Sequence, residues 1–119
     1  MENSMVNFVV DNKTPLENKD ALLQIKNFFC RELPYFELSE EFDGDNNYNG
    51  FRIQYEKKEG IIVLSSSWRG MEHEIVIDGK VFSLLNFEPQ MRDILSCSET
   101  NLNFTLSVLK RFIDEQSLI

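Results

Sequence analysis

The 119-residue chain has only two cysteines and one histidine, the side chains that most often form disulfides, bind metals or act in catalysis in small proteins. Its two cysteines, Cys30 and Cys97, are far apart and have no C-x-x-C spacing, which argues against a disulfide framework or a zinc site. We expect both to be small buried apolar residues in a reducing compartment. The single histidine, His73, has no serine or cysteine motif beside it. It is therefore expected to have an orienting or surface role and not a catalytic one.

Long hydrophobic runs are missing as well. The longest aliphatic run, from Ile61 to Leu64, is far too short to span a membrane. The first residues, MENSMVNFVVDNK, contain neither a basic leader nor the apolar core of a signal peptide. The sequence therefore predicts a cytoplasmic protein without membrane association, and its length predicts one domain over residues 1–119.

Positive charge is scarce: 12 Lys and Arg stand against 20 Asp and Glu, which gives a net charge of -8. Nucleic-acid binding needs clustered cations, so this balance opposes it and favours a basic protein partner, with solubility alone as the other explanation. The chain has no glycine-rich phosphate loop and no G-x-S-x-G elbow. We therefore expect no enzyme activity, no cofactor and no metal site.

The periodicity of apolar residues changes twice along the chain. A strand is predicted at Met5 to Val10, and the stretch Thr14-Pro15-Leu16-Glu17 has the form of a capping box that opens a helix. That helix carries an apolar stripe and ends at Pro34. The stripe consists of Leu22, Ile25, Phe28, Phe29 and Leu33.

Alternating patterns follow. Phe36, Leu38 and Phe42 are predicted to point to one side of a strand, with Glu37 and Glu41 on the other. In the return strand Phe51, Ile53 and Tyr55 oppose Arg52, Gln54 and Glu56. Further strands are predicted at Ile61 to Trp68, Glu74 to Ile77 and Val81 to Phe87, the last two joined by an Asp78-Gly79 turn.

Helical spacing returns near the C-terminal end. A short helix is predicted at Pro89 to Leu95, and a long final helix from a cap at Ser98 or Thr100. The predicted fold is α+β: an antiparallel β-meander of about five strands, with an N-terminal and a C-terminal helix packed on one face.

The segment DNNYNGFRIQYE, residues 45–56, matches the pattern of an EF-hand calcium loop. Such a loop lies between two helices, whereas Pro34 and Gly44 interrupt the preceding segment and alternation follows the loop. We therefore interpret the segment as the tip and return strand of a hairpin, and calcium binding is the less favoured alternative.

The same hairpin gathers acidic residues around an aromatic side chain, because ELSEEFDGD has five acidic residues and no basic one. Such a surface suits the capture of a cationic protein, although a solvated polar face is the simpler alternative. The candidate partner-binding residues are Glu37, Glu40, Glu41, Asp43, Asp45, Tyr48, Glu56 and Glu59.

A small acidic α+β chain with the segment ELSEEFDGDNNY resembles the immunity proteins of bacterial toxin and immunity systems, including contact-dependent growth inhibition. The resemblance implies a monomer or weak homodimer that blocks a cognate toxin domain, often a basic nuclease. A second resemblance, to type III secretion chaperones, implies an obligate dimer that holds an unfolded effector. That class has a helix inserted among its strands, which this sequence does not predict.

Overall fold

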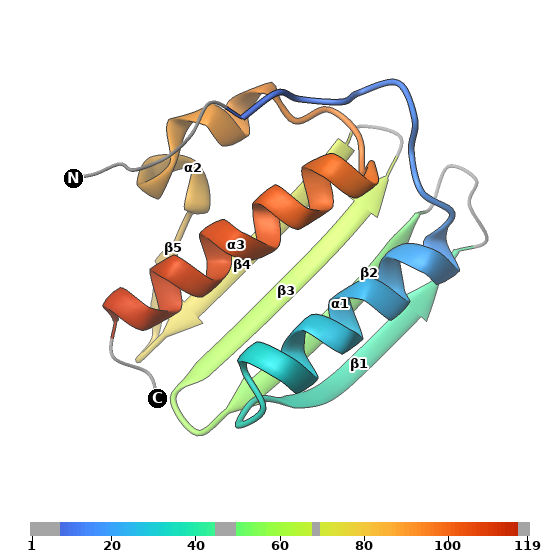
Figure 1. The fold of residues 1–119 in the computed structure, drawn as a ribbon. Helices are drawn as coiled ribbons and strands as arrows, with labels where there is room; N and C mark the ends of the chain where they lie inside the picture. The colour runs from blue at the N-terminus through green and yellow to red at the C-terminus, as the bar shows by residue number, and fades with distance from the viewer. Residues whose placement is uncertain (1–7, 45–49, 68–69, 117–119) are drawn as a thin grey trace.

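The computed structural model describes residues 8–44, 50–67 and 70–116 of the chain (Figure 1). The elements in sequence order are α1 (Asn18–Glu32), β1 (Glu37–Asp43), β2 (Phe51–Lys57), β3 (Gly60–Ser67), β4 (Gly70–Ile77), β5 (Lys80–Phe82), α2 (Leu84–Phe87), the 3-10 helix η1 (Pro89–Asp93) and α3 (Glu99–Glu115). The predicted α+β class is confirmed.

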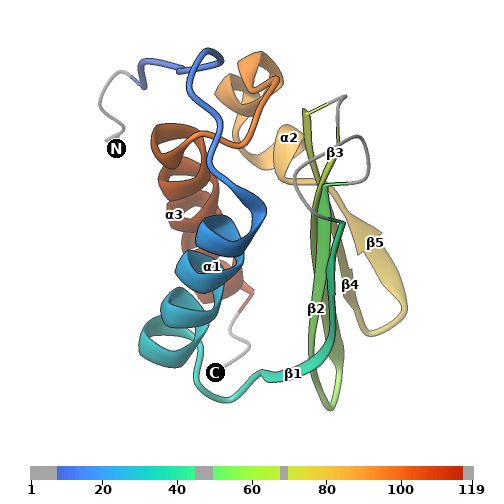
Figure 2. The same cartoon turned by 90° about the vertical axis from the view of Figure 1, so that its right-hand side faces the viewer.

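The five strands form one antiparallel sheet in the order β1-β2-β3-β4-β5. Helices α1 and α3 lie side by side on one face of it (Figure 2). Phe29 of α1 stacks on Tyr55 of β2, with ring centroids 3.7 Å apart, and Phe112 of α3 contacts Phe82 of β5 at 5.4 Å. The predicted meander with both helices on one face is confirmed, and no described element covers the other face.

Helix α1 begins later than predicted. Pro15 forms an isolated antiparallel bridge with Ser98, and the amide of Leu16 donates a hydrogen bond of 2.9 Å to the carbonyl of Cys97. Glu17 takes the N-cap position without a side-chain capping bond, so the predicted capping box does not form. Pairing with the residues before α3 keeps this segment extended. The helix ends at Glu32, before Pro34, as predicted.

Strand β1 contains a bulge between Leu38 and Glu40, which the alternation pattern does not predict. Beyond the bulge Glu41 lies opposite Ile53, and Phe42 lies opposite Arg52. Because directly opposed residues point to the same face of a sheet, the bulge reverses the predicted sides. Phe42 points away from the helices and is 54% exposed, whereas Glu41 points toward α1.

The segment after β4 differs from its prediction. The Asp78-Gly79 turn forms, and both residues have the positive φ of a type I′ turn, 51° and 80°. Strand β5 nevertheless ends at Phe82 instead of Phe87. The Ser83 hydroxyl accepts a hydrogen bond from the amide of Leu85, which caps α2. The predicted helix near Pro89 forms as η1.

Helix α3 begins at the first of the two predicted caps, because the Ser98 hydroxyl accepts a 3.1 Å hydrogen bond from the amide of Asn101. The cysteine prediction is half correct. Cys97 is buried, and burial raises the pKa of its thiol to about 12. Cys30 is exposed, because it lies next to Phe29 on α1 but outside the buried stripe.

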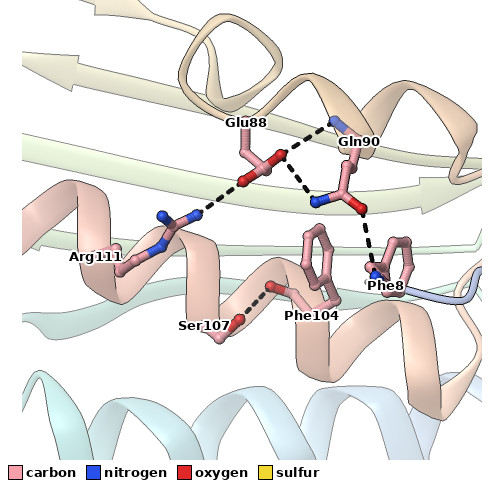
Figure 3. A network of polar contacts seen from close by, with 6 residues as sticks. All are labelled: Phe8, Glu88, Gln90, Phe104, Ser107 and Arg111. Atoms are coloured by element: carbon pink, nitrogen blue, oxygen red, sulfur yellow. Dashed lines mark hydrogen bonds and ion pairs between the residues drawn. The ribbon is translucent and has the colours of Figure 1, made fainter. Parts of the chain in front are cut away.

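The segment before α1 is anchored to the C-terminal helices. Residues 8–10 form no strand, which corrects that part of the Met5 to Val10 prediction, while residues 5–7 lie outside the described residues. The ring of Phe8 stacks on Phe104 at 3.8 Å, and its amide donates to Gln90 (Figure 3). The amide of Gln90 donates to Glu88, which also accepts from Arg111 of α3 at 3.1 Å.

Asn101 is the second anchor of this segment and is completely buried. Its side-chain carbonyl accepts from the amide of Asp11 at 3.0 Å. Its side-chain NH₂ group lies within 2.8–3.0 Å of three oxygens, on Asp11, Asn12 and Ser96. One buried amide therefore joins the segment before α1 to the residues around the start of α3.

Candidate functional site

The uncovered side of the sheet, which we call the open face, is assigned from strand register. Phe51, Ile53 and Tyr55 of β2 are buried toward the helices, so Arg52 and Glu56 point the other way. Residues opposite these two on the other strands share their side. The open face comprises Glu37, Glu40, Phe42, Arg52, Gln54, Glu56, Ile61, Val63, Ser65, Glu72, Glu74, Val76 and Val81.

Acidic residues dominate the charge of the open face. Of the strand residues assigned to it, five are glutamates and one, Arg52, is a cation. The lysines of these strands, Lys57 and Lys80, are in the row of Gly60 and Ile77, which belongs to the helix side. The open face is therefore net negative by four charges on its own strands.

One end of this charge pattern is neutralised internally. Arg52 forms an ion pair with Glu40 and donates a hydrogen bond of 3.1 Å to Gln54. Gln54 in turn donates to Glu56 at 2.8 Å. Exposed pairs of this kind contribute about 0–1 kcal/mol to stability. Their main effect is to hold the side chains of β1 and β2 in a fixed arrangement.

Glu72 and Glu74 of β4 differ from this group. Within the described ranges, neither side chain forms a hydrogen bond or an ion pair, and both residues are exposed. They lie opposite Ser65 and Val63 of β3 in the middle of the sheet. As far as the described part of the chain shows, these two carboxylates are available to pair with cations of another molecule. Prediction from acidic runs missed them, although their alternation with Met71, His73 and Ile75 signals an outward position.

An apolar row crosses the same face beside the acidic residues. Ile61, Val76 and Val81 are consecutive neighbours on β3, β4 and β5, and Glu56 continues the row on β2. Ile61 is 37% exposed and Val81 is 70% exposed. A row of apolar side chains edged by charges is the composition expected of a protein-binding surface.

The bulge in β1 divides the predicted acidic hairpin between two faces. Glu37, Glu40 and Glu56 lie on the open face, and Glu59 is exposed in the turn between β2 and β3. Asp45 and Tyr48 lie outside the described residues.

Glu41 and Asp43 are the two predicted residues on the helix side. Glu41 pairs with Lys26 at 3.0 Å, and Asp43 accepts from Asn18 at 3.2 Å. These contacts join the edge strand to α1. Both carboxylates therefore support the structure at that edge.

The second half of the segment that matches a calcium loop is strand β2, and strand β1 precedes the segment. Since both are strands, the helix-loop-helix of an EF-hand is not formed. Glu56, at the twelfth position of the pattern, lies on the open face and accepts from Gln54. Among the residues that the structure describes, no group of three or more side chains is placed to hold a metal ion.

His73 connects β4 to α2. Its Nε2 accepts a hydrogen bond of 2.8 Å from the amide of Leu84, and burial lowers its pKa. The imidazole thus has an orienting role in this contact, one of the two roles predicted for it.

Comparison with protein-family models, with curated proteins and with solved structures finds no match to this chain. The described helices are all too short or too polar to cross a membrane. The functional assignment therefore depends on the geometry and charge of the open face.

Proposed function

We propose that this chain is a binding protein that captures a basic protein on its open face, and that it acts as a cytoplasmic immunity protein against a cognate bacterial toxin domain. The observation that supports the proposal most is a pair of exposed glutamates, Glu72 and Glu74, which have no partner among the described residues and lie next to an exposed apolar row. We infer no catalytic activity for the chain itself. Its expected oligomeric state is a monomer or weak homodimer.

The physical basis is that charged and apolar residues of the open face would contribute differently to binding of the partner. Complementary charges speed encounter and fix orientation, and close charge pairs across an interface couple by about 1.5–7 kcal/mol. The row of Ile61, Val76 and Val81 would supply apolar surface that is removed from water when the partner binds. Carboxylates in this arrangement would mimic the negative charge of the nucleic-acid phosphates that a nuclease binds. The open face would therefore cover a cationic active site or nucleic-acid groove. The same charge opposes binding of nucleic acid to this chain.

The chaperone class remains a second candidate because the apolar row would suit pairing of two copies. It requires an obligate dimer, whereas the immunity class does not. Sedimentation equilibrium at low and high salt separates the two. A monomer whose partner binding weakens steeply with salt supports the immunity class, and a dimer that persists in salt supports the chaperone class.

The proposed function is tested by recovering the partner of the tagged chain from its own host at low salt. The test variant carries Glu72→Lys and Glu74→Lys. The matched control carries Asp93→Lys and Glu115→Lys, two exposed acidic residues of η1 and α3 that are off the open face. Both variants change the net charge equally, by four units, since each replaces two acids by two lysines.

We expect the test variant to lose the partner and the control to retain it. The recovered protein should arrest growth when expressed alone, and co-expression of this chain should restore growth. Retention of the partner by the test variant would show that the open face is not the binding surface. A partner that is harmless when expressed alone would refute the immunity role while leaving the binding surface intact.

A further inference from the structure

A cavity of about 420 Å³ lies on the helix side of the sheet, between β4, η1 and α3. Glu72 is on its lining and also belongs to the open face, whereas the other lining residues lie outside the open face. Its apolar lining includes Met71 of β4, Leu85 of α2, Met91 of η1 and Ile94. The volume falls within the range of about 300–1,000 Å³ that small-molecule sites occupy.

Apart from Glu72, the polar side chains that line this cavity can donate hydrogen bonds. The Nε2 atom of His73 accepts from the amide of Leu84, so the ring proton of the neutral imidazole is on Nδ1. No described residue accepts a hydrogen bond from that Nδ1 atom. The Ser83 hydroxyl also lines the cavity and accepts from the amide of Leu85, which leaves its proton free to donate.

Thr105 of α3 supplies the third donor and the least expected one. The residue is 1% exposed, yet its Oγ1 atom has no hydrogen-bond partner. Buried polar atoms are nearly always paired, and an unpaired one costs about 1–3 kcal/mol. A ligand that accepts a hydrogen bond in the cavity would remove that cost.

Arg92 of η1 gives the cavity its charge. Across the described residues its guanidinium makes no ion pair, and the residue is exposed. Glu72 is the acidic residue on the lining, but it lies opposite Ser65 on the open face, whereas Met71 and His73 on either side of it point toward the helices. The ionised group available on the cavity side is therefore a cation.

We propose that this cavity binds a small carboxylic acid with a short apolar chain. A carboxylate only accepts hydrogen bonds, which matches donors from His73, Thr105 and Arg92. The apolar chain would lie against Met71, Met91 and Ile94. At about 30 Å³ for each water in the liquid, the volume equals that of roughly 14 waters, which is enough for an acid of about eight non-hydrogen atoms.

The experiment is isothermal titration of the full chain with hexanoate, and with hexan-1-ol as the neutral probe of the same chain length. The variants are Arg92→Gln and Thr105→Val, with Arg31→Gln as the matched control because Arg31 is an exposed arginine of α1 outside the cavity. We expect saturable binding of hexanoate and weaker binding of hexan-1-ol. Arg92→Gln should weaken hexanoate about tenfold with little change for hexan-1-ol, and Arg31→Gln should change neither.

Thr105→Val separates a ligand-binding role from a structural one. Removal of the unpaired hydroxyl should raise the thermal midpoint of the free protein and, at the same time, weaken hexanoate binding several-fold. Higher stability with unchanged affinity would overturn the role of Thr105 as a ligand donor. The proposal as a whole fails if hexanoate shows no saturable binding up to about 10 mM, an affinity of roughly 3 kcal/mol. It also fails if hexan-1-ol binds equally well.

Discussion

Replacement of Asn101 by alanine should be among the most destabilising single changes in this protein. The side chain is completely buried and joins Asp11, Asn12 and Ser96. The NH₂ group has two hydrogens for three oxygens, so the substitution removes two donated bonds and one accepted bond. At about 1 kcal/mol for each bond, the free energy of unfolding should fall by about 3 kcal/mol. That is a large fraction of the 5–15 kcal/mol typical of a domain.

The assay is urea denaturation followed by far-ultraviolet circular dichroism, with Asn103→Ala as the control. Asn103 lies two residues further along α3 and is exposed. Because alanine has the higher helix propensity, the control should be neutral or slightly stabilising. Asn101→Asp keeps the shape and the acceptor but turns a carboxylate toward three oxygens, so it should be at least as damaging as alanine. A loss below about 1 kcal/mol for Asn101→Ala would show that water replaces these bonds, and the reasoning would be wrong.

Three further predictions concern titration and reactivity. Burial holds the pKa of His73 below its ordinary value, so His73 of the unfolded chain takes up a proton at a higher pH than His73 of the native protein. The free energy of unfolding should therefore fall as pH drops from about 7.5 to 5.5. His73→Gln should flatten this part of the plot of urea midpoint against pH, and a plot identical to that of the wild type would refute the lowered pKa of His73. Burial alone would raise the pKa of Glu88, but hydrogen bonds from Gln90 and Arg111 outweigh it and lower the pKa. Glu88→Gln should therefore cost about 1–3 kcal/mol at neutral pH. The difference from the wild type should begin to shrink as pH falls below about 4.5, where Glu88 of the unfolded chain takes up a proton, and should vanish once pH falls below the lowered pKa of the native carboxylate. In the native protein a maleimide should label Cys30 within minutes and Cys97 only after unfolding, as mass spectrometry of the two peptides would show; equal labelling of both would contradict the burial of Cys97.

Much of the fold is predictable because most of its signals are periodic. Alternation in Phe51, Ile53 and Tyr55 fixes which side of β2 is buried, since a strand has only two faces. The Asp78-Gly79 pair predicts its turn because both residues tolerate positive φ. A cap at Ser98 or Thr100 followed by helical spacing predicts α3, and the cap that forms is Ser98.

Other features depend on distant partners and are not visible in a local pattern. The stretch from Thr14 to Glu17 has the letters of a capping box, but pairing of Pro15 with Ser98 across the fold decides its conformation. The Ser39 hydroxyl donates to the carbonyl of Gln54 beside the bulge, and no rule of alternation predicts the extra residue there.

For the same reason, local patterns place only some of the acidic residues of the open face. The acidic run at residues 37 to 45 predicts one partner-binding surface. The bulge instead turns Glu41 toward α1, where it pairs with Lys26. Glu72 and Glu74 are separated by a histidine and form no run. Their position becomes significant only when β4 is placed beside β3 with its register known.

The anchoring of the first described segment to α3 has a consequence for synthesis of the chain. Asp11 and the Asn101 side chain that holds it are 90 residues apart. At about 5–20 residues per second, a ribosome needs roughly 5–18 s to add those residues. During that interval the segment before α1 has no partner, although α1 and the β1–β2 hairpin can already meet. Anchoring of this segment should therefore be the last step of folding. A nascent chain released before residue 101 should form the β-sheet but lack the contacts between the segment before α1 and α3.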